Sequence, residues 1–221
     1  MSETIERVPR TEREAADSYT RLSKWYDRLG WSSEGPHIAE GLRLLGVQPG
    51  ERVLEVGFGT GHGLVALAHA VGLSGHVIGI DLAAGMIAVA REQLGKDNMT
   101  NAVRLIRGSA LHLPYAAASF DAVFSSFMLD LIDTPDIPCV LAEMRRVLKP
   151  GGRVGLVSMS KACAGNFVVR VYERFHRWLP SLIDCRPIYL QYSMEAAGLH
   201  CEAYQTRSMW GIPVEIAVAK R

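Results

Sequence analysis

The 221-residue sequence lacks the long apolar runs and the charge excess that mark membrane-spanning and nucleic-acid-binding proteins. No stretch is apolar over the length needed to cross a bilayer, and the polar N-terminal segment has no signal-peptide core. The formal net charge of +1 gives no general attraction to nucleic acid. We therefore expect a cytoplasmic protein without a nucleic-acid partner.

Cysteine and histidine are few and scattered, which argues against disulfide and metal centres. The four cysteines, Cys139, Cys163, Cys185 and Cys201, form no C-x-x-C pair and no zinc-type spacing. The seven histidines show no metal-ligand spacing either. These patterns predict free thiols in a reducing compartment and no bound metal.

The hydrophobic pattern predicts strands that alternate with helices over the middle of the chain. Strands are expected at 52–57, 76–81, 103–109, 120–128 and 153–160, and helices at 62–71, 84–95 and 136–149. This alternation predicts a Rossmann-like α/β fold, a mostly parallel sheet with helices on both faces. A short helix at 191–198 then precedes two strands without a helix between them. They must form an antiparallel hairpin, which completes a seven-stranded sheet.

Two helices are predicted ahead of the sheet. From Ser18 to Leu29, apolar and aromatic residues recur every three or four positions, as on one helical face. The segment from Pro36 to Leu45 has proline in its first turn and Gly46 as its stop. Residues 1–16 are charged and poor in large apolar side chains, so we expect them to be frayed or weakly helical.

The segment VLEVGFGTGHG (53–63) is rich in glycine between a predicted strand and a predicted helix. Gly57 permits a tight turn, Gly59 lets a ligand approach the backbone, and Gly61 lets the helix pack on the strand. The free N–H groups at the start of the helix favour a polar ligand. The spacing is G-x-G-x-G, whereas dinucleotide-binding proteins have G-x-G-x-x-G. A flexible turn is the simpler alternative for this loop taken alone.

Asp81 is a second signal, because it ends the next predicted strand. A carboxylate at the tip of that strand can accept hydrogen bonds from both hydroxyls of a ribose. Ligands of doubly wound sheets lie beyond the carboxyl ends of the strands. Together the glycine loop and Asp81 predict an adenosine-type ligand at that edge of the sheet.

Five segments resemble the motifs of the class I S-adenosylmethionine-dependent methyltransferases, in the family's order and spacing. They are EVGFGTG (55–61), VIGIDLAAGMIAVAR (77–91), GSALHLPY (108–115), SFDAV (119–123) and RRVLKPGGR (145–153). The similarity covers about residues 18–160, and the closing hairpin also matches. KWYDRL (24–29), LPY (113–115) and SMSK (158–161) resemble the ubiquinone/menaquinone-biosynthesis C-methyltransferase-like branch. That branch includes phospholipid and natural-product methyltransferases, so the resemblance leaves the acceptor open.

The resemblance implies a bound S-adenosylmethionine, which is released as S-adenosylhomocysteine. It implies that Glu55 and the backbone of 57–61 hold the methionine part and that Asp81 holds the ribose. The full set of cofactor-binding residues that it implies is Tyr19, Tyr26, Glu55, Gly57, Phe58, Gly59, Gly61, Asp81, Leu82, Met86, Ser109, Ala110 and Ser125.

Within this set, the resemblance implies that Leu82 and Met86 pack against the adenine and that Ser125 lies next to the transferred methyl group. Tyr19 and Tyr26 would close over the cofactor. Ser109 and Ala110 would read the adenine edge. The family often has aspartate where Ser109 stands, and a hydroxyl accepts a hydrogen bond from an amino group less well than a carboxylate. Adenine selectivity would then depend on the backbone N–H of Ala110.

Methyl transfer from a sulfonium requires chiefly alignment and exclusion of water, although a carbon or oxygen nucleophile can also need a base. Asp130, after the fourth predicted parallel strand, is the first candidate base, with a capping or turn carboxylate as the simpler alternative. His62, at the start of the helix after the glycines, is the second candidate, and a solvated first-turn residue is its simpler alternative. Asp133 precedes Thr-Pro and is expected to cap the next helix.

We expect one methyltransferase domain over 1–221. Its parts are an N-terminal helical cap (1–46), a cofactor-binding core (47–160), a lid-like insertion (161–190) and a closing helix and hairpin (191–221). The insertion carries an aromatic helical stripe and a basic face at 165–179. It can be a substrate lid or a peripheral membrane contact, and a core-facing helix is the simpler alternative. Arg186 beside it could pair with an oxygen or phosphate of the substrate.

The predicted function is methyl transfer to an apolar or amphipathic small molecule, such as a quinol, a lipid or a natural product. The alternatives are a phospholipid headgroup N-methyltransferase and a non-catalytic S-adenosylmethionine-binding partner subunit. A nicotinamide-dependent oxidoreductase is disfavoured by the glycine spacing and the closing hairpin. The oligomeric state stays open.

Overall fold

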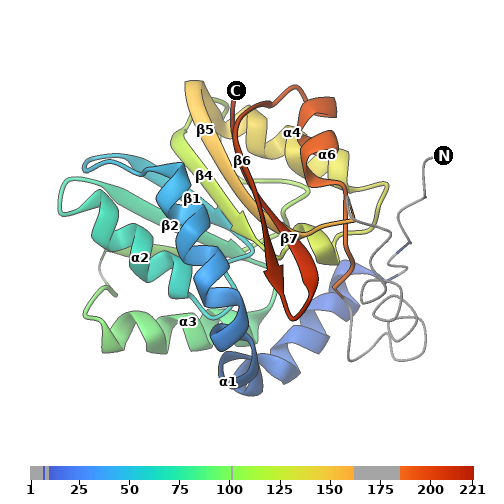
Figure 1. Ribbon diagram of the computed structural model, residues 1–221. Helices are drawn as coiled ribbons and strands as arrows, with labels where there is room; N and C mark the ends of the chain where they lie inside the picture. The colour runs from blue at the N-terminus through green and yellow to red at the C-terminus, as the bar shows by residue number, and fades with distance from the viewer. Residues whose placement is uncertain (1–6, 8–9, 101, 162–184) are drawn as a thin grey trace.

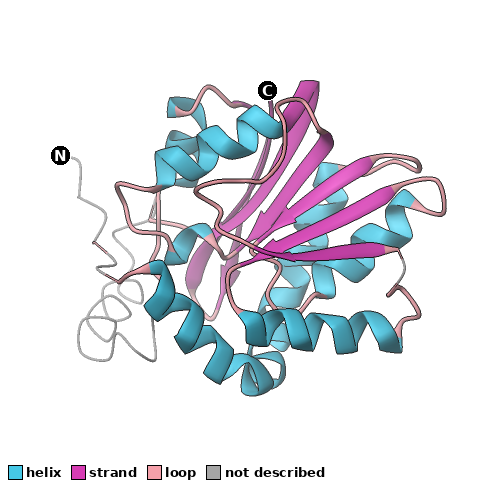
Figure 2. Ribbon diagram, turned by 180° about the vertical axis from the view of Figure 1, so that it is seen from behind, coloured by secondary structure: helices cyan, strands magenta, loops and turns pink. Residues whose placement is uncertain are grey.

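A seven-stranded sheet with the order β3-β2-β1-β4-β5-β7-β6 runs through the residues that the structure describes (Figure 2). This computed structural model describes residues 7, 10–100, 102–161 and 185–221, and the side chains of 24–31 lie outside that description. The strands are β1 (Arg52–Val56), β2 (His76–Asp81), β3 (Val103–Arg107), β4 (Phe120–Ser126), β5 (Leu148–Met159), β6 (His200–Met209) and β7 (Ile212–Lys220).

Strand directions confirm the predicted fold class. Strands β1 to β5 pair in parallel, whereas β7 runs antiparallel to both β5 and β6. The helices are α1 (Glu12–Leu45), α2 (His62–Val71), α3 (Ala84–Lys96), η1 (Leu129–Leu131), α4 (Ile137–Val147) and α6 (Leu190–Ala196). Helices α1, α2 and α3 lie on one side of the sheet, and α4 and α6 lie on the other (Figure 1).

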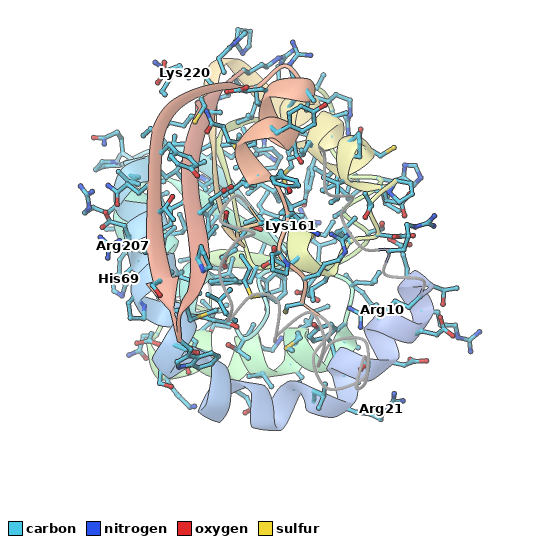
Figure 3. All side chains as sticks on the ribbon, turned by 45° about the vertical axis from the view of Figure 1, so that its right-hand side comes forward. Arg10, Arg21, His69, Lys161, Arg207 and Lys220 are labelled. Atoms are coloured by element: carbon cyan, nitrogen blue, oxygen red, sulfur yellow. The ribbon has the colours of Figure 1, made fainter. Side chains whose placement is uncertain are left out.

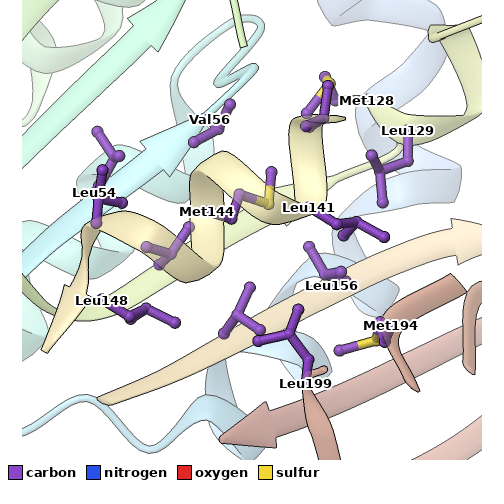
Figure 4. Packing of buried hydrophobic residues seen from close by; sticks show 14 of the residues in the cluster. Leu54, Val56, Met128, Leu129, Leu141, Met144, Leu148, Leu156, Met194 and Leu199 are labelled. Carbon is purple, nitrogen blue, oxygen red and sulfur yellow. The ribbon is translucent and has the colours of Figure 1, made fainter. Parts of the chain in front are cut away.

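The core consists of two apolar layers, one on each face of the sheet. Successive residues of a strand point to opposite faces, so Val53 packs in the layer of α2 and α3 while Leu54 packs in the layer of α4. Figure 4 shows Leu141 and Met144 of α4 in the second layer, beside strand residues such as Leu156. Burial on both faces explains why the central strands are nearly all apolar.

The N-terminal helix differs from the prediction. A single helix, α1, runs from Glu12 to Leu45 and ends at Gly46 as expected, with Pro36 inside it. Because proline has no backbone N–H, it removes one hydrogen bond and kinks a helix without ending it. Figure 1 shows α1 sharply bent partway along its length. The start at Glu12, inside the segment expected to be frayed, is fixed by a capping box between Thr11 and Glu14.

Loops from the parallel strands meet at one edge of the sheet. The backbone N–H of Gly57, after β1, donates to the carbonyl of Ile80 at 2.8 Å. The backbone N–H of Gly108, after β3, donates to the backbone carbonyl of Asp81 at 3.0 Å. The N–H of Phe127, after β4, donates to the carbonyl of Val157 at 2.7 Å. These bonds join the carboxyl ends of β1, β2 and β3 and those of β4 and β5. A ligand crevice is expected at this edge of the sheet.

Residues 162–184, which include most of the predicted insertion and its stripe at 165–179, lie outside the described residues. The ends of that segment are described and meet at β5. The N–H of Lys161 donates to the carbonyl of Ile188, and the N–H of Ile188 donates to the carbonyl of Met159. The division of the chain into cap, core, insertion and closing hairpin stays a prediction.

Candidate functional site

A pocket opens at the carboxyl edge of the sheet, where the loops after β1, β2, β3 and β4 meet α1. Ten residues that the sequence singled out line it: Tyr19, Glu55, Gly57, Phe58, Gly59, His62, Asp81, Leu82, Met86 and Ala110. Figure 3 shows Arg10, a further lining residue, beside the N-terminal part of α1 and far from Arg207 on the β6–β7 hairpin. The pocket therefore lies on the α1 side of the carboxyl edge.

The glycine loop bends at Gly57 and opens at Gly59. Gly57 has a φ of +70°, and a Cβ there would lie 2.3 Å from the side chain of Met128. Gly59 has a φ of +53°, but a Cβ there would have no atom within 4 Å. The space beside Gly59 is part of the pocket. Glycine at position 57 therefore makes room for the side chain of Met128, whereas Gly59 leaves the backbone accessible to a ligand.

The next two glycines allow close packing of helices, in a way that differs from the prediction. A Cβ on Gly61 would lie 2.8 Å from Cβ of Ala90, so Gly61 accommodates α3 and not the strand. The close approach of α2 to β1 occurs at Gly63, where a Cβ would lie 2.2 Å from Oε1 of Glu55. Gly63 thus makes room for the Glu55 carboxyl group beneath the first turn of α2.

Asp81 ties the ends of β1 and β2 together. Its carboxylate accepts hydrogen bonds from the backbone N–H of Gly59 at 3.0 Å and of Ala83 at 2.9 Å. Burial raises the pKa of Asp81 to about 6, and these backbone N–H donors oppose the shift. The Asp81 carboxylate lines the pocket in a partly buried position, so it is placed to accept hydrogen bonds from a ligand as well.

Glu55 carries a buried polar atom that the described residues leave without a partner. The side chain is 1% exposed and lines the pocket, and its Oε2 has no hydrogen bond from any described residue. Burial, with a smaller effect from Asp81, raises the pKa of Glu55 well above its usual range. A buried carboxyl oxygen without a partner costs stability, and a ligand donor would remove that cost.

Two predicted serines use their hydroxyl groups within the protein. The hydroxyl of Ser125 is buried and donates to the carbonyl of Val56 at 2.7 Å, while the neighbouring Ser126 lines the pocket. The hydroxyl of Ser109 accepts from the N–H of Leu111 at 3.0 Å and donates to the carboxylate of Glu12. Ala110 lines the pocket beside it, as do Gly108 and Leu111, whereas Ser109 does not.

Asp130 is wholly buried in the turn η1, under the end of β5. Its carboxylate accepts from the hydroxyl of Ser158 and from the N–H of Met159 at 3.0 Å, and its carbonyl accepts from the N–H of Arg186 at 3.1 Å. Burial raises the pKa of Asp130 to about 7, although Ser158, Met159 and the positive charge of Arg186 oppose the shift. This geometry joins η1 to β5 and to the chain after 184, and the side chain is not among those that line the pocket.

Arg186 is itself 2% exposed, and its guanidinium donates to the carbonyl of Ile132. The acidic residues after η1 that line the pocket are Asp133 and Asp136. Asp133 forms an ion pair of 2.7 Å with Arg7, and the N-terminal cap residue of α4 is Asp136, where the sequence predicted Asp133. His62, the second candidate base, lines the pocket as the first residue of α2.

The first turns of α1 and the residue before its N-cap supply pocket residues that the sequence pattern missed. They are Arg10, Glu12, Ala15 and Ala16. Tyr19 follows them, with the guanidinium of Arg10 lying 5.5 Å from the centre of its ring. The signal that could have found them is the run TERE (11–14), which fits a capping box. The side chain of Tyr26 lies outside the described residues.

Two other kinds of site are not found among the residues that the structure describes. Among them, no group of three or more histidine, cysteine, aspartate or glutamate side chains could hold a metal ion. Within the same part of the chain, no helix is long and apolar enough to cross a membrane.

Comparisons with known proteins agree on a family. Residues 53–152 match the family model of a methyltransferase domain. Over 181 residues the chain is 35% identical to a demethylmenaquinone methyltransferase of Lactobacillus johnsonii, covering 77% of this chain and 70% of that protein. A demethylmenaquinone methyltransferase of Oceanobacillus iheyensis is 37% identical over 64% of this chain and 58% of its own length.

A solved structure shows the same fold. The crystal structure of a SAM-dependent methyltransferase from Aquifex aeolicus superposes with a TM-score of 0.66 and 20% identity, covering 91% of this chain and 97% of that one. Its low identity makes it a likeness of fold alone, whereas the relatives above set the family. The chain belongs to the class I S-adenosylmethionine-dependent methyltransferases, in the branch that contains the demethylmenaquinone methyltransferases.

Proposed function

We propose that this methyltransferase transfers a methyl group to a ring carbon of an apolar, quinol-type acceptor. The observation that carries the proposal is the identity of 35% and 37% to two demethylmenaquinone methyltransferases, which extends well beyond the glycine loop. The apolar side chains on one side of the pocket support it independently, because they suit a ring with little polar surface.

The polar part of the pocket fits S-adenosylmethionine. When bound, that cofactor supplies an activated methyl group on a sulfonium and its own leaving group. Oε2 of Glu55 lacks a partner among the described residues and suits the ammonium group of the methionine part. The Asp81 carboxylate suits the two ribose hydroxyls, and the open backbone at Gly59 leaves room for the ligand between them.

The acceptor part of the pocket is proposed to lie toward β4. There the lining side chains are Phe127, Met128, Leu131 and Ile132, which follow β4, together with Ile38 of α1. Phe127 and Met128 are themselves mostly buried, so they form a firm wall. An acceptor ring held against this wall would exclude water from the reacting carbon and hold it in line with the methyl group.

A ring carbon that gains a methyl group must lose its proton, and a quinol reacts faster when its hydroxyl is deprotonated. His62 is the proposed base, because it was predicted from the sequence and lines the pocket. Asp130, the other candidate, is wholly buried in contacts with Ser158 and Met159. We therefore propose a structural role for Asp130 and a chemical role for His62.

The experiment is an acceptor panel assayed by release of S-adenosylhomocysteine. The panel contains a demethylated naphthoquinol with a short isoprenoid tail, an ethanolamine phospholipid in micelles and a simple phenol. The proposal expects turnover with the naphthoquinol, and His62→Ala should lower kcat while leaving cofactor affinity close to wild type. Turnover with the ethanolamine lipid alone would favour the headgroup N-methyltransferase, and tight cofactor binding without turnover would favour a non-catalytic partner subunit.

A further inference from the structure

The loop after β3 meets the first turn of α1 at a point where the pocket is lined by both. Ala110 and Glu12 each line the pocket, and Ser109 lies between them in the hydrogen-bond network. The Ser109 hydroxyl has a single hydrogen, which it donates to the Glu12 carboxylate, and it already accepts from the N–H of Leu111. Ser109 therefore uses its hydrogen to hold Glu12 in place.

The position of Glu12 is fixed from two sides. The capping box sets the start of α1, because the N–H of Thr11 donates to Oε2 of Glu14 at 2.8 Å and the Glu14 N–H donates to the Thr11 hydroxyl at 3.3 Å. Further along, α1 packs backbone to backbone on α3. A Cβ on Gly85 would lie 2.7 Å from Cα of Thr20, an approach that only glycine allows. The helix therefore delivers the Glu12 carboxylate to the loop after β3.

The chemistry of this corner suits a base with an exocyclic amino group. Asp81 ends β2, and β3 is the next strand outward, so a nucleoside whose ribose is held at Asp81 can extend its base toward Ala110. Leu82 and Met86 line the same part of the pocket and suit the faces of an aromatic base. An ionised carboxylate only accepts hydrogen bonds, and it has about four lone-pair sites. The Ser109 hydroxyl occupies one of these sites on Glu12, so the others can accept from a ligand.

We propose that Glu12 accepts a hydrogen bond from the amino group of the cofactor's adenine, and that Ser109 is the positioning residue that holds its carboxylate. The carboxylate that reads the base would thus come from the first turn of α1, outside the segment matched by the methyltransferase model at 53–152. This inference rests on the proposed placement of the cofactor with its ribose at Asp81.

The proposal predicts discrimination between adenine and hypoxanthine. A carboxylate accepts from an amino group but repels a carbonyl oxygen at the same position. The test measures the Kd values of S-adenosylhomocysteine and S-inosylhomocysteine by isothermal titration calorimetry. Because hydrogen bonds to charged groups are among the stronger ones, wild type should prefer the adenosyl compound by about tenfold or more.

Three variants separate Glu12 from a general effect of charge or folding. Glu12→Ala should weaken binding of S-adenosylhomocysteine by about tenfold and remove most of the preference. In Glu12→Gln the side-chain amide can accept from an amino group or donate to a carbonyl, so the two compounds should bind nearly equally. Asp17→Ala removes an exposed acidic charge from the same helix and should change neither Kd. Thermal melting of each variant checks that it is folded.

A rescue variant tests where the carboxylate must lie. In the Glu12→Ala background, Ser109→Asp places a carboxylate on the loop itself and should restore much of the preference for the adenosyl compound. A Glu12→Ala protein with wild-type affinity and preference would overturn the inference. So would a wild type that binds both compounds equally, and in that case cofactor binding itself would stand. A wild type that binds neither compound would instead overturn the proposed cofactor site, and the inference with it.

Discussion

Gly59→Val tests whether the glycine loop exists for a ligand or only for a turn. The φ of Gly59 is +53°, so a residue with a side chain there costs roughly 1–2 kcal/mol of backbone strain. No atom lies within 4 Å of the added Cβ, so the variant should fold. The side chain would enter the pocket and clash with a cofactor that touches the backbone. At about 1–3 kcal/mol for such overpacking, affinity should fall roughly five- to 150-fold.

Gly46→Val is the matched control. Gly46 has a φ of +60°, and the nearest atom to its added Cβ is the Leu44 carbonyl oxygen at 3.8 Å. Gly46 caps α1 away from the pocket. The Gly46→Val protein should therefore lose comparable stability and keep its cofactor affinity. Calorimetric titration with S-adenosylhomocysteine and thermal melting give the two readouts. If both variants melt alike and bind alike, the open space at Gly59 is not the cofactor's approach, and the loop is only a turn.

Three further predictions concern the carboxyl groups of Asp81 and Asp130. Asp81→Ala should weaken S-adenosylhomocysteine binding at least about tenfold in calorimetry, and unchanged affinity would remove Asp81 from the site. Since burial raises the pKa of Asp81 to about 6, wild-type binding should also weaken as pH falls through that value, and a flat profile would contradict this. Burial raises the pKa of Asp130 from 3.8 to about 7. The contribution of this group to the free energy of unfolding is therefore fully present below about pH 4 and is lost as the pH rises to about 7. Asp130→Asn should flatten stability over that window in denaturant titrations, and a wild-type pH dependence would refute it.

The central strands and the glycine loop could be predicted from local sequence because their causes are local. A strand buried on both faces must be apolar, and a loop that bends after β1 needs glycine, as at Gly57 with its positive φ. The sequence pattern alone assigned Gly61 to the wrong neighbour, because packing of α2 against Ala90 of α3 depends on the arrangement of distant elements.

Single-residue choices along a strand or turn were less predictable. Ser125 and Ser126 are adjacent on β4, and only the second lines the pocket. Asp130 and Asp133 are three residues apart, and the turn η1 buries the first while the second reaches the pocket rim. Which of two nearby residues faces the pocket depends on where the strand ends and how the next turn begins. Residue types do not specify these two features.

The first turns of α1 were missed for a different reason. Residues 12–17 have few large apolar side chains, so periodicity gives no helical signal there. The helix is held instead by a capping box, by Ala16 in the core and by the close approach of Thr20 to Gly85. These interactions bring Glu12 to the pocket from outside the five segments that resemble methyltransferase motifs.

The most direct test of the proposed methyl transfer uses S-adenosylmethionine with a ¹³C-labelled methyl group and a demethylated naphthoquinol. The account predicts one labelled methyl group per product molecule, bound to a ring carbon in the NMR spectrum, and loss of that product in Gly59→Val but not in Gly46→Val. Label on an acceptor oxygen, or label on a lipid headgroup nitrogen when that lipid competes, would contradict the proposed acceptor. S-adenosylhomocysteine binding without any labelled product from the panel would contradict catalysis of this transfer.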